Sequence, residues 1–242
     1  MVSGAEGKIA EVIIKQAVPK VTDYVRMLWS GKKFLILGPA RAGKTSFLTY
    51  LEHLILPLEK QTGSTVGVHT GHDRTLKLGP NGTLELRVRK PRDVAGQMPI
   101  HHIEYIKDYK PHCIIVVLDA TTFWGFPASA SSLEWFRQFC PLLNTLLISN
   151  PKVVARLKAM TVIINKWDRV EAKDDKEDED NRKLFESYIR DILDESLQNR
   201  FYEPGGKRAI DVLPCALAKT RLGDRLAKEL VQSIAQTLDS AE

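Results

Sequence analysis

The segment that most constrains this chain is residues 38–45, because it has the pattern G-x-x-x-x-G-K-[ST]. It follows the apolar run 34–37, a predicted strand, and precedes a predicted helix over 45–58. Glycines let the backbone approach a phosphate closely, and N–H groups at the start of a helix attract its charge. Lys44 would bridge the β- and γ-phosphates, and the Thr45 hydroxyl would bind Mg²⁺. The pattern predicts binding of a nucleoside triphosphate through Gly38, Ala40, Arg41, Ala42, Gly43, Lys44, Thr45 and Ser46.

Strand and helix signals alternate along the rest of the chain. Continuous apolar runs at 114–118 and 161–164, and a weaker one at 210–213, are typical of buried parallel strands. Residues 76–78 and 84–88 alternate around Pro80-Asn81-Gly82, which predicts a hairpin. Helices are expected over 127–158, with breaks at Pro141 and Pro151, over 181–198 and over 221–239. The pattern predicts an α/β fold with three layers: a mostly parallel six-stranded sheet with one antiparallel edge hairpin, covered by helices on both faces.

We expect one nucleotide-binding domain over 32–242, with insertions near 121–158 and 171–183. Residues 1–31 are predicted to be a helical extension, since 9–29 has apolar residues at helical spacing. The acidic run 171–180 is interpreted as a solvated insertion. Aromatic residues near 124–136 are interpreted as core of the other insertion.

Charge and cysteine content narrow the functional classes. The chain has a net charge of +5, and residues 74–92 alone carry that excess. Basic side chains there can protect an edge strand or meet an acidic partner. Three scattered cysteines favour a reducing compartment. No apolar run approaches the roughly 20 residues of a membrane helix, so a cytoplasmic protein is expected.

Asn165-Lys166-Trp167-Asp168 follows the predicted strand 161–164 and has the form N-K-x-D. At this position the chain resembles the Ras-like superfamily of GTP-binding proteins. The resemblance implies that Asp168 reads the guanine N1–H and 2-amino group. It also implies that the Lys166 stem covers the purine and that Asn165 ties this loop to the phosphate loop. Cys215-Ala216-Leu217 is similar to the family's S-A-[KL] segment, in which a backbone N–H meets guanine O6.

Asp93-Val94-Ala95-Gly96-Gln97 resembles the D-x-x-G-Q segment of the same superfamily. The resemblance implies that Asp93 holds Mg²⁺ through water, Gly96 contacts the γ-phosphate and Gln97 orients the attacking water. The basic residues before Asp93 depart from the family, so the strand is expected to end early or the aspartate to sit differently. A rival metal residue is Asp119, which ends the apolar run 114–118 in the manner of a Walker B motif.

One threonine between the predicted helix and hairpin would complete the Mg²⁺ site. Thr62, Thr65 and Thr70 all lie in that interval, and we select Thr65. The segment 65–68 is similar to T-I-G-F of Arf-like proteins, so the nearest branch is Arf or the signal-recognition-particle receptor β-subunit, although Ala95 agrees better with Ras.

The resemblance implies a GTP-binding molecular switch that hydrolyses GTP slowly, with Lys44 and Gln97 as catalytic residues and Mg²⁺ as cofactor. A protein effector or regulator is the expected partner; nucleic acid is not. Association with a membrane surface through the N-terminal helix stays open. Two alternative functions also stay open: a nucleotide-stabilised receptor or scaffold module with little hydrolysis, and an ATPase that uses Asp119.

Overall fold

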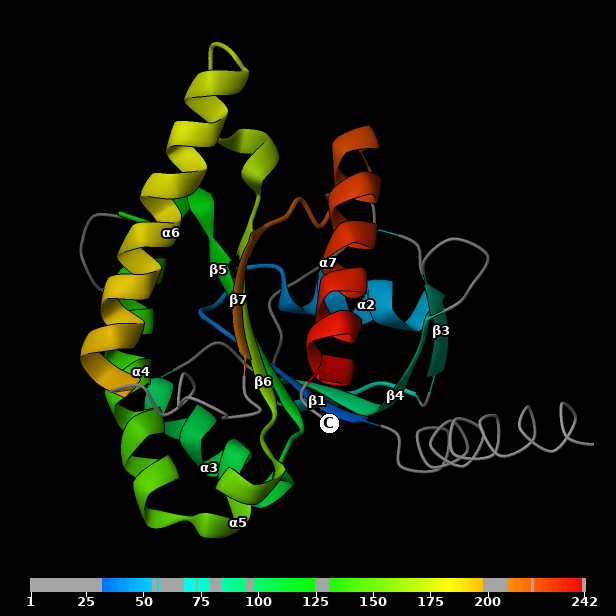
Figure 1. The fold of residues 1–242 in the computed structure, drawn as a ribbon, viewed down its shortest axis with the longest axis vertical. Helices are drawn as coiled ribbons and strands as arrows, with labels where there is room; N and C mark the ends of the chain where they lie inside the picture. Colours follow the sequence, from blue (N-terminus) through cyan, green and yellow to red (C-terminus); the bar gives the residue numbers. More distant parts are fainter. Residues whose placement is uncertain are drawn as a thin grey trace, which may run out of the picture.

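The computed structural model is an α/β fold in which helices cover both faces of a sheet with a parallel centre (Figure 1). It describes residues 32–53, 56, 68–72, 74–78, 84–94, 98–124, 131–197, 209–218 and 220–240. The expected helix over 9–29 therefore lies outside the described residues. The strands are β1 (Lys32–Leu37), β2 (Val68–Thr70), β3 (Arg74–Leu78), β4 (Leu84–Val94), β5 (Cys113–Asp119), β6 (Ala159–Asn165) and β7 (Ala209–Pro214). The helices are α2 (Lys44–His53), α3 (Pro99–Tyr109), α4 (Ser132–Ser149), α5 (Pro151–Arg156), α6 (Asp175–Leu197) and α7 (Arg221–Ser240), with short 3₁₀ helices η2 (Ala120–Thr122) and η4 (Trp167–Arg169).

The sheet runs in the order β2-β4-β1-β5-β6-β7, and β3 also pairs with β4. From β4 to β7 all neighbours are parallel. Both β2 and β3 are antiparallel to β4. The sequence predicts six strands, whereas the sheet of the described residues has seven, because Val68–Thr70 forms an additional short strand.

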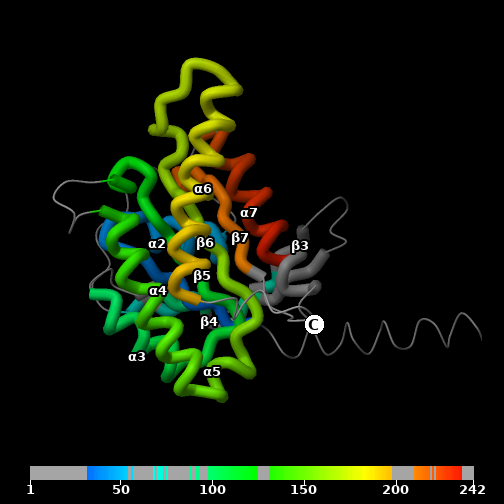
Figure 2. The backbone as a smooth tube through the Cα atoms, turned by 60° about the vertical axis from the view of Figure 1, so that its left-hand side comes forward, coloured from blue at the N-terminus to red at the C-terminus, as the bar shows by residue number. Residues whose placement is uncertain are grey.

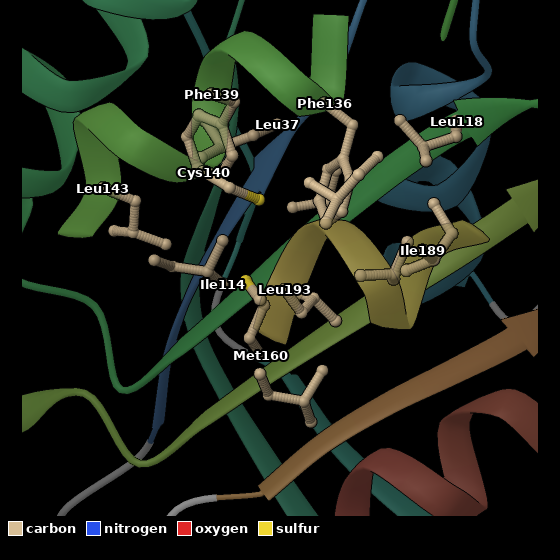
Figure 3. Close-up of a cluster of buried hydrophobic side chains, with 14 of the residues drawn as sticks. Leu37, Ile114, Leu118, Phe136, Phe139, Cys140, Leu143, Met160, Ile189 and Leu193 are labelled. Carbon is tan, nitrogen blue, oxygen red and sulfur yellow. The ribbon is translucent and has the colours of Figure 1, made fainter. Parts of the chain in front are cut away.

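The central strands are buried on both faces, which explains their continuous apolar runs. One core lies between the sheet and α3, α4, α5 and α6, and alternate residues of the same strands face a second core under α2 and α7. Figure 3 shows the first core, in which Phe136 and Phe139 of α4, Ile189 of α6 and Leu118 of β5 are among the packed side chains. In Figure 2, α6 crosses in front of β6 and β7.

Strand β4 is longer than expected and continues through the basic segment to Val94. Its register with β1 shifts by one residue between Lys33 and Leu35, which marks a bulge beside Pro91. A proline cannot donate to a neighbouring strand, so a bulge accommodates it there. The expectation that this strand ends early is wrong.

Two helix boundaries also differ from the sequence prediction. Pro141 lies inside α4 without ending it. Because Pro141 is exposed, its ring projects into solvent while the opposite side of α4 packs into the core. The acidic run is not an insertion throughout, since α6 already begins at Asp175. Asp174 accepts a hydrogen bond from Glu177 N at 2.8 Å, and carboxylates in a first turn stabilise a helix N-terminus.

Candidate nucleotide site

The loop 38–43 between β1 and α2 has a backbone that only particular residues allow. Gly38 and Gly43 have φ of 139° and 104°, and Arg41 adopts the left-handed region at 62°. A Cβ on Gly38 would lie 2.1 Å from the Val117 carbonyl oxygen on β5. A Cβ on Gly43 would lie 2.1 Å from Asn165 Nδ2. Both glycines are therefore required by close packing as well as by conformation.

Positive charge and N–H groups gather where this loop enters α2. Lys44 is 3% exposed, and its Nζ donates a 2.8 Å hydrogen bond to the Pro39 carbonyl across the loop. The first turn of α2 holds no acidic residue that would compete for its N-terminal charge. Thr45 is half-buried in that turn, and Ser46 is buried. Such a loop fits an anion with several oxygens.

Asn165, at the end of β6, joins three segments that are distant in sequence. Its Nδ2 donates to the Ala42 carbonyl at 2.7 Å, and its Oδ1 accepts from Leu217 N at 2.8 Å. The side chain is only 3% exposed. The expected contact between Asn165 and the phosphate loop is confirmed. The same amide also positions the loop 215–217 after β7, a contact that the N-K-x-D motif does not predict.

Backbone hydrogen bonds complete the junction between the ends of β6 and β7. Cys215 N donates to the Ile164 carbonyl at 2.9 Å, and Trp167 N donates to the Cys215 carbonyl at 3.0 Å. Cys215, Ala216 and Leu217 are buried. Burial, together with the nearby negative charge of Asp168, raises the pKa of the Cys215 thiol to about 12. The thiol therefore stays neutral. Cys215, in the place of the serine of the S-A-[KL] segment, thus adds no charge to the loop.

Asp168 is exposed within η4, on the loop that Asn165 begins. Lys166, the residue before η4, is in the left-handed region with φ of 62°. Its ammonium forms an ion pair with the Asp119 carboxylate. Lys166 is thus oriented by a residue on the neighbouring strand.

The two oxygens of Asp119 are both engaged. Oδ1 accepts from Thr121 N at 2.9 Å and from Thr121 Oγ1 at 2.7 Å, while Oδ2 faces Lys166. Asp119 is 4% exposed and stands in register with Asn165 on β6. These contacts place it beside the N-K-x-D loop, with its carboxylate engaged by Thr121 and Lys166.

Trp167 attaches the same loop to α6. Its Nε1 donates to Asp178 Oδ1 at 2.8 Å, and its ring meets that of Phe185 at a centroid distance of 5.2 Å. This contact of Asp178 was not predicted, because Asp178 belongs to the acidic run that is interpreted as a solvated insertion. A tryptophan inside the motif, with acidic residues about ten positions later, is the signal that could have indicated the contact.

Asp93 lies near the carboxyl end of β4, opposite Ile36 of β1 and His69 of β2. Ile36 precedes Gly38 by two residues. This register therefore places the backbone of Asp93 next to the end of β1 that leads into the phosphate loop. Thr65, Gly96 and Gln97 lie outside the described residues, as does the alternative Thr62, whereas Thr70 belongs to β2.

Within the described ranges, no group of three or more His, Cys, Asp or Glu side chains is arranged to hold a metal. Mg²⁺ at a triphosphate takes most of its ligands from phosphate oxygens and water, so Thr45 and one carboxylate fit that demand.

Neither protein-family models nor curated proteins match this chain at a significant level. Among the helices that the structure describes, none has the length and apolar character needed to cross a bilayer.

Proposed function

We propose that this chain is a GTP-binding switch protein with slow GTP hydrolysis, built on a P-loop fold of the Ras-like type. The strand order and the position of the phosphate loop at the carboxyl end of β1 support that fold. The observation that carries the proposal is the double hydrogen bond of Asn165. It brings the phosphate loop, the N-K-x-D loop and the loop 215–217 to one place.

The roles of the residues follow from that arrangement. The backbone of 40–45 and Lys44 would bind the phosphates, and Lys44 would offset the negative charge that develops on transfer. Asp168 would accept two hydrogen bonds from guanine, a donor pair that adenine does not present. Gln97 would orient water, and Gly96 would sense the γ-phosphate. Thr45, Thr65 and Asp93 would hold Mg²⁺, which supplies charge neutralisation at the β- and γ-phosphates.

The first test is nucleotide loading of the purified full chain with labelled GTP, in competition with unlabelled GTP, ATP or xanthosine triphosphate. We expect GTP to displace the label at least a hundredfold better than ATP. Asp168→Asn should move the preference toward xanthosine triphosphate, because the amide donates where that base offers an oxygen. Asp194→Asn, an exposed aspartate of α6, is the control and should leave selectivity unchanged. Effective competition by ATP would refute the guanine assignment.

Single-turnover hydrolysis separates the switch from the nucleotide-stabilised module. Intrinsic turnover is expected on the order of 10⁻⁴ to 10⁻² per second, and Gln97→Ala should slow it further. Stable GTP over many hours in the wild type would favour the module.

A further inference from the structure

Three large apolar side chains form an exposed surface at the side of α6. Trp124 follows η2 and is 51% exposed, while Leu184 and Tyr188 lie one turn apart on α6 and are 45% and 39% exposed. Only seven large apolar side chains of the described residues are this exposed, and three of them are here. The interpretation of Trp124 as insertion core is therefore wrong. We call Trp124, Leu184 and Tyr188 the aromatic surface.

Contacts between aromatic rings fix the position of Trp124 within the aromatic surface. Trp124 meets Phe123 at 4.9 Å, Phe185 at 4.6 Å and Tyr188 at 5.9 Å between ring centroids, each in an edge-to-face arrangement. Phe123 and Phe185 are buried in the core. Because these contacts already fix the indole, a partner that binds it loses little further side-chain entropy.

The charge around this surface is strongly negative. Helix α6 contains nine Asp or Glu and four Lys or Arg, a formal charge of −5, in a chain whose total is +5. Asp180 lies one turn before Leu184, and Asp191 and Glu195 continue the same helix face beyond Tyr188. All three carboxylates are exposed and form no ion pair within the described part of the chain. The amino-terminal part of α6 also rises above the sheet in Figures 1 and 2, where a partner can reach it.

We infer that the aromatic surface and its acidic flanks dock a cationic amphipathic segment of a partner protein. Apolar side chains at helical spacing would cover Trp124, Leu184 and Tyr188, and Lys or Arg at either end would meet Asp180, Asp191 and Glu195. Rigid Trp and Tyr side chains are the residues that dominate binding energy at such surfaces. Negative charge disfavours an anionic membrane or a nucleic acid here. None of these six residues belongs to the proposed nucleotide site.

The test uses the full-length chain and a fluorescein-labelled synthetic helix-forming peptide. Leu occupies peptide positions i, i+4, i+7 and i+11, and Lys or Arg occupies the flanks. A second peptide carries Glu in place of every Lys and Arg. Fluorescence anisotropy should show saturable binding of the cationic peptide that weakens several-fold between 50 and 300 mM NaCl. The charge-reversed peptide should not bind.

Variants locate the binding. Trp124→Ala and Tyr188→Ala should each weaken the cationic peptide at least tenfold. Ile148→Ala, which removes an apolar side chain that is 59% exposed at the end of α4, should leave affinity unchanged. Leu184→Lys and the double change Asp191→Lys with Glu195→Lys alter only exposed positions. These variants should also weaken binding of the cationic peptide, so they test the inference if an aromatic variant does not fold.

Three results would overturn the inference. The cationic peptide could fail to saturate the wild type, or it could bind all variants equally. Self-association of the wild type in sedimentation, lost in Leu184→Lys, would instead assign this surface to a second copy of the chain. Because the assay needs no nucleotide, its outcome is separate from that of GTP loading.

Discussion

At the scale of single residues, the site depends on side chains that orient other side chains. Asp119 is the clearest case, because it is buried and divides its carboxylate between Thr121 and the ammonium of Lys166. Lys166 in turn stands directly before η4, which carries Asp168. A buried carboxylate that pairs with a neighbouring cation fixes the geometry of both.

Asp119→Asn tests this positioning role. The amide oxygen can still accept from Thr121, but it leaves Lys166 without a counter-charge. We expect the free energy of unfolding to fall by about 1–2 kcal/mol, since Lys166 is partly exposed and water replaces part of the interaction. Release of a fluorescent GDP analogue should become several-fold faster, with an unchanged requirement for Mg²⁺. Urea denaturation and stopped-flow release measure the two effects.

Asp108→Asn, an exposed carboxylate of α3, is the matched control and should change neither quantity. A large loss of Mg²⁺ affinity in Asp119→Asn, with unaltered GDP release, would return Asp119 to the metal site.

At the scale of elements, the start of α7 lies unusually close to the loop 215–217. Thr220 Oγ1 accepts a hydrogen bond from Gly223 N at 2.9 Å and so caps the helix. A Cβ on Gly223 would lie 2.2 Å from the Ala218 carbonyl oxygen and 2.6 Å from that of Ala216. Helix and loop can approach this far only because residue 223 has no side chain.

Gly223→Ala should therefore destabilise the protein, although the same change inside an ordinary helix stabilises it by up to about 1 kcal/mol. We expect a loss of about 2 kcal/mol, because two backbone carbonyls must move. Weaker GTP binding should accompany it, because Ala216 belongs to the proposed guanine pocket. Chemical denaturation and nucleotide titration measure these effects. Lys228→Ala, exposed on the same helix, should be close to neutral, and a stabilised Gly223→Ala would contradict the close approach.

Helices and strands could be predicted from the sequence where the residues that determine them are close together in the chain. The strands over 34–37, 114–118, 161–164 and 210–213 were all predicted, because burial on both faces leaves continuous apolar runs. Neither the passage of β4 through Pro91 nor that of α4 through Pro141 was predicted. Both depend on neighbouring elements. Strand β4 accommodates Pro91 through a bulge against β1, and α4 accommodates Pro141 because that residue faces solvent while the opposite side of the helix is packed.

At the scale of the whole molecule, His112 links the amino ends of three central strands. Its Nδ1 accepts from Lys33 N at 3.0 Å on β1, and its carbonyl accepts from Lys158 N at 2.8 Å just before β6. Burial, followed by the positive charges of Lys32, Arg156, Lys33 and Lys158, lowers the pKa of His112 to about 4. The unfolded chain has no such constraint, and its histidine keeps an ordinary pKa near 6.5.

Stability should therefore fall in acid through this residue. Between pH 6.5 and 4 the unfolded state binds a proton that the folded state refuses, so the free energy of unfolding decreases as pH decreases. We expect a contribution of about 2 kcal/mol by pH 4.5, reduced from the full value because His112 is partly exposed. His112→Asn keeps an acceptor but does not titrate, so it should remove that part of the pH dependence. Urea midpoints at pH 7 and pH 4.5 measure it, and identical pH dependence in both proteins would refute the assignment.

By itself, the sequence determined the kinds of segment that this chain contains: a glycine loop between a strand and a helix, an N-K-x-D motif after a buried strand, and alternating apolar runs. These signals are local, because backbone conformation and burial periodicity act over a few residues. Only the tertiary structure decided which side chains meet. Asn165 reaches a carbonyl 123 residues away, and Lys166 reaches a carboxylate 47 residues away. Such pairings follow from sheet order and register, which no single segment encodes.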